Sequence, residues 1–177
     1  MAPLIIMIEL EKTFLAKILP DLTGCKSKEI IDVYYPKESN HPVLRLRKNG
    51  DKYEMTKKYP VKEGDASAQH EHTIPLTKEE FDAFFKLEGK KVHKIRYCYE
   101  YQGRIAEVDI FQGDLKGLVL VDFEFEKEED KNNFQMPDFC LANVTQEKFT
   151  AGGMLCGKSY MNIINDLARF GYKKLDF

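Results

Sequence analysis

Acidic and basic residues recur along this 177-residue chain as like-signed pairs, two positions apart. Successive side chains of a strand point to opposite faces, so residues two apart share a face. A face that meets only water usually mixes signs, because like charges side by side repel. The pairs are Glu9 and Glu11, Arg45 and Arg47, Lys94 and Arg96, Glu107 and Asp109, and Asp122 and Glu124. This spacing indicates charged faces that bind a ligand.

The residue types indicate which ligand. Rows of Arg and Lys suit a polyanion, because the planar guanidinium group matches phosphate oxygens. Rows of Glu and Asp would repel that polyanion unless a hard divalent cation lay between them, and Mg²⁺ or Mn²⁺ takes such oxygen ligands. Both kinds of wall around one cavity predict a short linear polyphosphate or a triphosphate, bound together with metal.

Strands must position these pairs. Most of the chain alternates with period two, which predicts strands over 4–14, 30–35, 42–48, 52–59, 68–76, 91–101, 104–111 and 118–126. Turn signals separate them, and "KNGDK" and "YQGR" are hairpin turns. Eight strands with few helices predict an α+β, mainly β fold, an eight-stranded antiparallel closed β-barrel with flanking helices.

The opposite faces of the charged strands are apolar, as Val108 and Ile110 or Val121 and Phe123 show. For any single strand, this alternation of charged and apolar residues is explained more simply by a sheet with one face in water. Like-signed pairs on strand after strand favour a barrel with charged walls inside. Its apolar outside would then be wrapped in part by helices.

Three helices are expected. Thr77 and Glu80 form a capping box before an apolar stripe of Phe81, Phe84 and Phe85. A short helix follows in "KEEDKNNF". The last covers 159–170, capped by Ser159, with an apolar stripe of Tyr160, Ile163, Ile164 and Leu167.

The segment "GGMLCGKS", 152–159, fits the G-x-x-x-x-G-K-[ST] pattern of a nucleotide-binding loop. Such a loop follows a buried apolar strand, whereas "NVTQEKFTA" is polar. Only one amphipathic helix and a tail remain after it. The segment is therefore interpreted as a glycine turn before the helix that Ser159 caps.

The totals limit the remaining possibilities. A net charge of -2 gives no general attraction to nucleic acid or to an anionic membrane. The four cysteines are scattered and favour reduced thiols in a cytoplasmic protein. The opening "MAPLIIMIEL" is too short to span a bilayer. A single domain over 1–177 is expected, with 159–177 as its C-terminal helix and tail. Met7 is a candidate start, which would make 1–6 an N-terminal extension. The protein is expected to be a monomer or a homodimer.

The charged motifs also resemble a known family. "IELEKTF" resembles the E-x-E-x-K signature of CYTH-domain proteins, the triphosphate tunnel metalloenzymes, and "LRLRKNGDKYEMTKK" resembles their R-x-R hairpin followed by T-x-K. "HEHTIPLT", "KKVHKIRY", "AEVDIFQGDLKGLVLVDFEF" and "VTQEKF" follow in the order and approximate spacing of the family. The likeness covers about residues 7 to 157 and implies an eight-stranded tunnel.

The resemblance implies a role for each matching position. Glu9 and Glu11, with Glu124 and Asp122, would hold a catalytic Mg²⁺ or Mn²⁺. Glu107 and Asp109 would help to hold a second metal or order the attacking water. The phosphates would be gripped by Arg45, Arg47, Lys58, Lys94, Arg96 and Lys148, and Glu71 would add acid to the tunnel wall. Of these residues, Glu9, Glu11, Lys58, Glu107 and Asp109 are expected to be catalytic.

One departure from the family keeps alternatives open. Thr13 replaces the family lysine, and Lys12 lies one place early, where strand parity points it out of the tunnel. We expect a metal-dependent phosphohydrolase that cleaves the terminal phosphate of tripolyphosphate or of a nucleoside or organic triphosphate. The alternatives are a class IV adenylyl cyclase, which makes cyclic AMP and pyrophosphate from ATP, and a polyphosphate-binding protein of low turnover.

Overall fold

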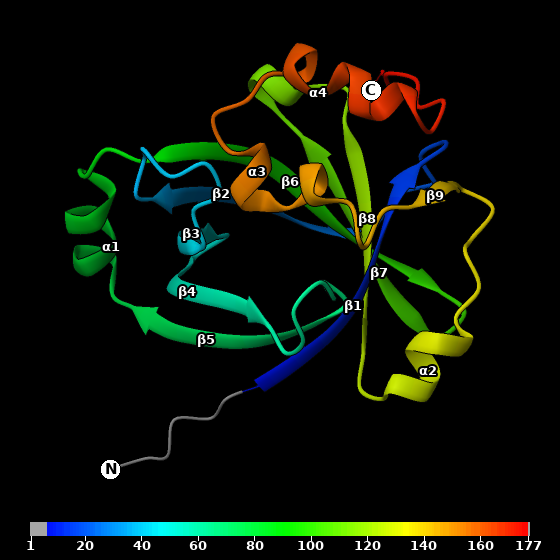
Figure 1. The fold of residues 1–177 in the computed structure, drawn as a ribbon, viewed down its shortest axis with the longest axis horizontal. Coiled ribbons are helices and arrows are strands. Elements are labelled where there is room, and N and C mark those ends of the chain that lie inside the picture. The colour runs from blue at the N-terminus through cyan, green and yellow to red at the C-terminus, as the bar shows by residue number, and fades with distance from the viewer. Residues whose placement is uncertain (1–6, 177) are drawn as a thin grey trace.

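The computed structural model describes residues 7–176, which form one closed barrel with short helices around it (Figure 1). The strands are β1 Met7–Ala16, β2 Lys26–Tyr35, β3 Leu44–Asn49, β4 Lys52–Pro60, β5 Ala68–Leu76, β6 Lys90–Tyr101, β7 Arg104–Phe111, β8 Val119–Phe125 and β9 Cys140–Asn143. The helices are α1 Lys78–Phe85, α2 Glu128–Asn133, α3 Gly152–Leu155 and α4 Tyr160–Ala168, with 3₁₀ turns η1 Gly113–Leu115 and η2 Lys148–Thr150. The eight predicted strands are present within one or two residues at most ends. However, β2 begins four residues earlier than predicted, and residues 4–6 of the first prediction lie outside the described part.

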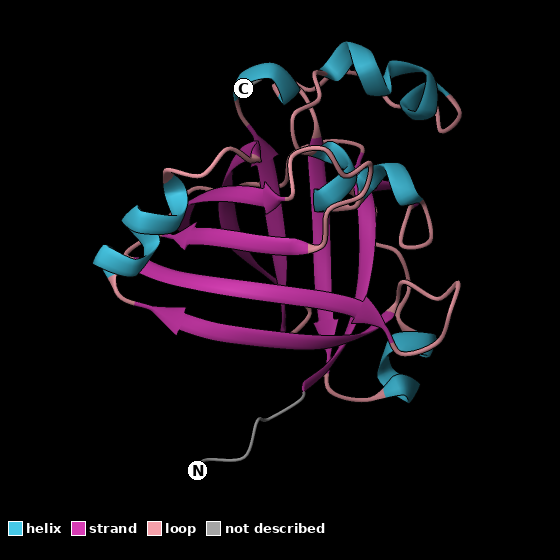
Figure 2. Cartoon of the chain, turned by 60° about the vertical axis from the view of Figure 1, so that its left-hand side comes forward, coloured by secondary structure: helices cyan, strands magenta, loops and turns pink. Residues whose placement is uncertain are grey.

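Strand β1 closes the barrel. The sheet runs β5-β4-β3-β2-β6-β7-β8-β1, with antiparallel pairing throughout. The first half of β1, 7–10, pairs with β5, and 10–15 pairs with β8, so the two ends of the sheet meet on one strand (Figure 2). The prediction of an eight-stranded antiparallel closed barrel is confirmed.

The ninth strand, β9, was not predicted. It is four residues long and pairs with residues 14–16 of β1, beyond the point where β5 leaves that edge. The sequence "CLAN" has no period-two alternation to announce a strand, and its pairing depends on an edge that only the folded barrel presents.

The apolar faces of the strands point outward, away from the lumen. Phe123 of β8 is fully buried, packs edge-on against Phe14 with ring centroids 6.1 Å apart, and meets Phe134 after α2 at 4.5 Å. Burying an aromatic side chain of this size stabilises a fold by about 1.5–3 kcal/mol. Apolar packing against α1, α2, α4 and the C-terminal segment therefore holds the barrel together from outside and leaves the lumen free for charge.

The predicted helix caps are present, but the predicted stripes are too wide. Thr77 and Glu80 form the capping box of α1, and Ser159 forms one with Asn162 at α4. Phe84 and Ile164 remain 39% and 38% exposed, because each short helix buries a narrower face than its sequence pattern suggests.

The nucleotide-loop interpretation was correctly set aside. No strand leads into Gly152, which is preceded by the 3₁₀ turn η2, although the glycines begin the short helix α3 where a turn was expected. Within residues 7–176, no helix is long and apolar enough to cross a membrane. All four cysteines are free thiols.

Candidate active site in the tunnel

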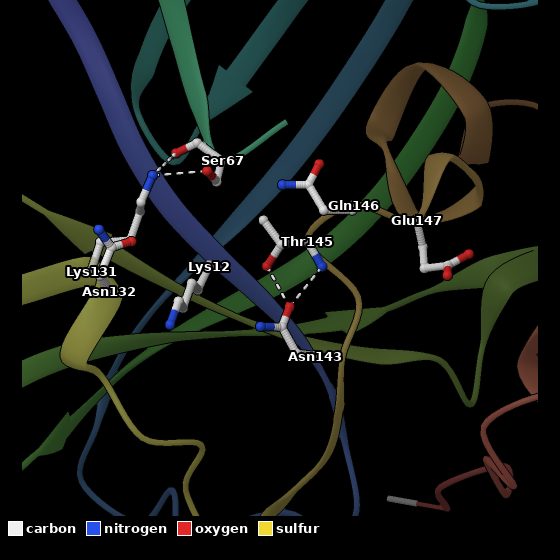
Figure 3. A pocket seen from close by; sticks show the side chains of 8 residues that line it. All are labelled: Lys12, Ser67, Lys131, Asn132, Asn143, Thr145, Gln146 and Glu147. Atoms are coloured by element: carbon white, nitrogen blue, oxygen red, sulfur yellow. Dashed lines mark hydrogen bonds between the residues drawn. The ribbon is translucent and has the colours of Figure 1, made fainter. Parts of the chain in front are cut away.

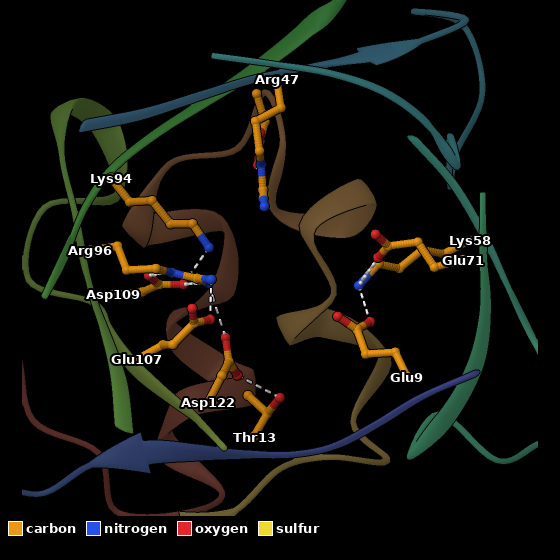
Figure 4. Close-up of polar contacts among 11 residues, drawn as sticks. Glu9, Thr13, Arg47, Lys58, Glu71, Lys94, Arg96, Glu107, Asp109 and Asp122 are labelled. Carbon is orange, nitrogen blue, oxygen red and sulfur yellow. Dashed lines mark hydrogen bonds and ion pairs between the residues drawn. The ribbon is translucent and has the colours of Figure 1, made fainter. Parts of the chain in front are cut away.

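A cavity of about 520 Å³ occupies the lumen. It is lined by every predicted site residue, namely Glu9, Glu11, Arg45, Arg47, Lys58, Lys94, Arg96, Glu107, Asp109, Asp122, Glu124 and Lys148. Figure 4 shows many of them pointing from opposite strands toward a common centre. The structure brings these residues together as the alternation predicted, and their roles remain proposals.

The wall formed by β6 and β7 is electrostatically paired. Arg96 lies directly opposite Asp109 in the strand register and donates from Nε and Nη2 to its carboxylate at 2.6 and 2.7 Å. Lys94 also donates to Asp109, and Arg96 donates to Glu107. Burial alone would raise the pKa of Asp109, but Arg96 and Lys94 hold it far below its usual range. This wall, which we call the paired wall, is a satisfied network of buried ion pairs.

A further buried acid, Asp32 of β2, was missed from the sequence. It is 2% exposed and accepts a bidentate pair of hydrogen bonds from Arg47, at 2.7 and 2.8 Å. Burial opposes its ionisation, but Arg47 lowers the pKa of Asp32 to about 2. The signal was a lone acid within the apolar run "IIDVYY", which has no like-signed neighbour two positions away. Asp32 fixes the direction in which Arg47 enters the lumen.

The wall formed by β1 and β8 is different. Glu11 and Glu124 lie directly opposite each other across these strands, a placement that is unfavourable for like charges. Burial raises the pKa of Glu11 to about 7, and Asp122, Glu9 and Glu124 add to the rise while Lys58 opposes it. Burial and the neighbouring acids also raise the pKa of Glu124. Glu9, Glu11 and Glu124 form what we call the acidic wall.

Lys58 is the only basic side chain within residues 7–176 that forms an ion pair with the acidic wall. It contacts Glu9 and lies 2.9 Å from Glu71 on the neighbouring strand, as Figure 4 shows. Its charge is therefore divided between acids of β1 and β5, and neither Glu11 nor Glu124 forms an ion pair in the described part. The acidic wall keeps an excess of negative charge.

Arg45 has a hydrogen-bond donor without an acceptor within residues 7–176. Its Nε is buried and has no hydrogen-bond partner among the described residues. A buried donor without a partner costs about 1–3 kcal/mol, so an acceptor is expected to fill this position. Because Arg45 lines the lumen, that acceptor would be an anion bound in the tunnel.

One end of the lumen is covered by the segment from Lys148 to Leu155. A Cβ on Gly152 would lie 2.1 Å from the Tyr34 hydroxyl, and one on Gly153 would lie 2.2 Å from the Pro42 carbonyl oxygen. Only glycine allows this segment to approach so closely. The glycines of the nucleotide-loop pattern therefore close the tunnel, and they place Lys148 in its lining.

The departure from the family pattern is visible in β1. Thr13 faces the lumen and donates from Oγ1 to Asp122 at 2.7 Å. Lys12 points away from the lumen, as strand parity predicted, and donates to the Phe134 carbonyl. The tunnel therefore contains a hydroxyl group at the position where the family has an ammonium group.

The donor set fits a hard divalent cation. Within residues 7–176, no three acidic, histidine or cysteine side chains form a ready-made coordination sphere, since Lys58 and Arg96 engage several of the acids. Glu11 and Glu124 nevertheless lie opposite each other, neither in an ion pair within residues 7–176, and carboxylate oxygens are the ligands that Mg²⁺ and Mn²⁺ take. A cation there would offset the burial and the nearby negative charges that raise both pKa values.

A closed antiparallel barrel with charged side chains inside and apolar side chains outside defines a tunnel protein. No protein-family model matches the chain. It is 33% identical over 144 residues to the inorganic triphosphatase of Nitrosomonas europaea, covering 80% of this chain and 92% of that protein. It is 26% identical over 130 residues to the inorganic triphosphatase of Acetivibrio thermocellus, covering 73% and 80%.

Solved structures agree. A crystal structure of the inorganic triphosphatase NE1496 superposes with a TM-score of 0.62 at 27% identity, covering 85% of this chain and 95% of that one. The chain belongs to the CYTH family of triphosphate tunnel proteins.

Proposed function

We propose that this protein is an inorganic triphosphatase that hydrolyses the terminal phosphoanhydride bond of tripolyphosphate with Mg²⁺ or Mn²⁺. The names of its relatives support the substrate. The observation that carries the proposal is the charge of the lumen: the described lining contains eleven carboxylates and seven lysine or arginine side chains. An anion of several charges would be repelled by this excess of acid unless divalent cations accompanied it.

Triphosphate binding would use the basic side chains that line the lumen. Arg45 offers its unpartnered Nε, and Arg47 is held by Asp32 so that it points into the lumen. Lys94, Arg96, Lys58 and Lys148 add positive charge around the cavity. Planar guanidinium groups bind phosphate oxygens well, so these side chains would orient a linear triphosphate.

Hydrolysis would then proceed by attack of water on the terminal phosphorus. The bond from that phosphorus to the bridging oxygen breaks, and orthophosphate and pyrophosphate are released. Fixed positive groups such as Arg96 and Lys94 would stabilise the charge that develops on the phosphoryl oxygens. A divalent cation held by Glu9, Glu11, Asp122 and Glu124, with Glu107 and Asp109 for a second ion or the water, would neutralise charge and position the nucleophile.

Thr13 favours a second candidate, a polyphosphate-binding protein of low turnover. The hydroxyl is engaged with Asp122 and supplies no positive charge, so this tunnel has one cation fewer than the family pattern. The basic side chains that would bind the phosphates all line the lumen without a contribution from Thr13. The two candidates share a ligand and differ in whether product appears.

The test is a product assay on purified protein with tripolyphosphate or ATP, in Mg²⁺, Mn²⁺ or EDTA, followed by ion chromatography. We expect tripolyphosphate to yield orthophosphate and pyrophosphate in equal amounts when Mg²⁺ or Mn²⁺ is present, and neither product in EDTA. Saturable tripolyphosphate binding without release would establish the binding protein instead. Cyclic AMP with pyrophosphate from ATP would establish the cyclase, and full turnover in EDTA would overturn the metal requirement.

A further inference from the structure

A second hollow, of about 300 Å³, lies outside the barrel, beyond β1 (Figure 3). Lys12 leaves β1 on the side opposite to Glu11 and Thr13, which line the tunnel, and enters this hollow. Lys131 of α2 borders the same hollow. Two lysines from elements far apart in the sequence thus share one cavity that has no part in the proposed hydrolysis.

The two ammonium groups differ in how they are held. Lys131 has a side chain only 5% exposed, donates to the Ser67 hydroxyl at 2.8 Å and pairs with the exposed Glu128 at 2.9 Å. Lys12 donates only to the Phe134 carbonyl, through a long hydrogen bond of 3.3 Å, among the contacts within residues 7–176. Lys131 is therefore a fixed border of the hollow, whereas Lys12 has N–H groups left for a ligand.

The rest of the lining adds neutral donors and little negative charge. Asn132 and Asn143 contribute amides, and Asn143 uses its oxygen for Thr145, which leaves its NH₂ group for another partner. The Gln146 amide is already held, because it donates to Asp65 and accepts from the Ala66 backbone, both at 2.9 Å. The single carboxylate of the lining is Glu147. Arg169 contacts that carboxylate twice, both at 3.1 Å, so its charge is matched.

We propose that this hollow binds a small inorganic phosphate anion, orthophosphate or pyrophosphate, through the Lys12 ammonium and the amide groups of Asn132 and Asn143. Unlike the tunnel, it has no excess of acid, so the anion would bind without a divalent cation. The loop 145–147 lines both cavities and separates them, so the two sites lie on either side of one wall. The proposal depends on these groups alone and does not require the tunnel to hydrolyse anything.

The test is a titration of ¹⁵N-labelled protein with orthophosphate, and separately with pyrophosphate, followed by amide chemical shifts in EDTA. EDTA removes the cations that phosphate binding in the tunnel would need. Saturable shifts are expected at Lys12, Asn132 and Asn143, which line the hollow and not the tunnel. The dissociation constant should rise about tenfold in Lys12→Gln, and stay within twofold in Lys12→Arg and in Lys127→Gln, a lysine outside the lining. Sulfate at equal ionic strength separates phosphate recognition from general anion binding.

Two outcomes would overturn the proposal. One is the absence of saturable shifts at these amides with either anion. The other is a dissociation constant that is unchanged in Lys12→Gln. Lys12 is half-buried, so a polar glutamine in its place should keep the fold. Shifts confined to Arg45 and Arg47 would place the anion in the tunnel and also contradict it. None of these results bears on the triphosphatase proposal, which is decided by product release.

Discussion

The two charged walls of the tunnel differ in whether their acids are compensated by neighbouring basic side chains. In the paired wall, Arg96 and Lys94 satisfy Asp109, and the acid keeps its charge at very low pH. In the acidic wall, Glu11 lies opposite Glu124, and burial raises the pKa of Glu11 to about 7. The comparison indicates that the ion pairs of the first wall stabilise the barrel, whereas the acids of the second wall lower its stability and suit the proposed cation site.

Asp109→Asn should give the largest effect, because it breaks the paired wall. Removing one partner of a buried ion pair leaves the other charges uncompensated and costs about 3–5 kcal/mol. Urea unfolding should show this loss in metal-free protein. Glu100→Gln, an exposed acid of the same β6–β7 hairpin, is the control and should change the free energy of unfolding by less than about 0.5 kcal/mol. Equal stabilities for both variants would mean that the wall is not a structural network.

Glu11→Gln should separate function from stability in the acidic wall. Changes around metal ligands cost about 10- to 100-fold in metal affinity or activity, so phosphate release from tripolyphosphate should fall by at least that factor with Mg²⁺ or Mn²⁺ present. The same variant should unfold at a higher temperature than the wild type in EDTA at pH 8, because a repelled buried charge is gone. Normal turnover would show that Glu11 is not needed for the reaction.

Arg45→Ala tests the unpartnered guanidinium. A hydrogen bond to a charged group contributes about 1.5–3 kcal/mol, so tripolyphosphate affinity should fall by roughly 10- to 100-fold. Orthophosphate affinity should change much less, since a single phosphate can bind elsewhere along the cations. Calorimetric titration measures both, with Arg104→Ala as a control outside the lumen. Equal losses for the two anions would indicate a single-phosphate site at Arg45.

The pH dependence of stability should show the smallest effect. A carboxyl whose pKa is raised in the folded state stabilises the fold at low pH, and that contribution is lost as pH rises through the folded value. Between about pH 4.5 and 7, the free energy of unfolding of metal-free protein should therefore decline more steeply in the wild type than in Glu11→Gln. Parallel pH profiles would contradict the raised pKa of Glu11.

The sequence predicted the barrel and the lining of its lumen because both depend on one local rule, the alternation of side chains along a strand. The like-signed pairs placed Glu9, Arg45 and Glu124 in the lumen before their neighbours were known. The partners of those charges could not be predicted, because Lys58 meets Glu71 and Arg96 meets Asp109 only through the register of separate strands.

Other features were missed because they depend on tertiary contacts. Asp32 is isolated in its sequence and becomes part of the site only through Arg47. Strand β9 depends on the edge of β1 that β5 leaves unpaired. The glycines at 152 and 153 were recognised as a turn signal, but their purpose, close approach to Tyr34 and Pro42, needs the folded barrel.

Electron paramagnetic resonance of Mn²⁺ at pH 8 would show whether the acidic wall binds a divalent cation, because the signal comes from the cation itself. The wild type should bind Mn²⁺ saturably, Glu11→Gln should weaken this binding by about tenfold or more, and Glu100→Gln should leave it unchanged. Mn²⁺ affinity that is the same in all three proteins, or no saturable binding even with tripolyphosphate present, would contradict the proposed cation site.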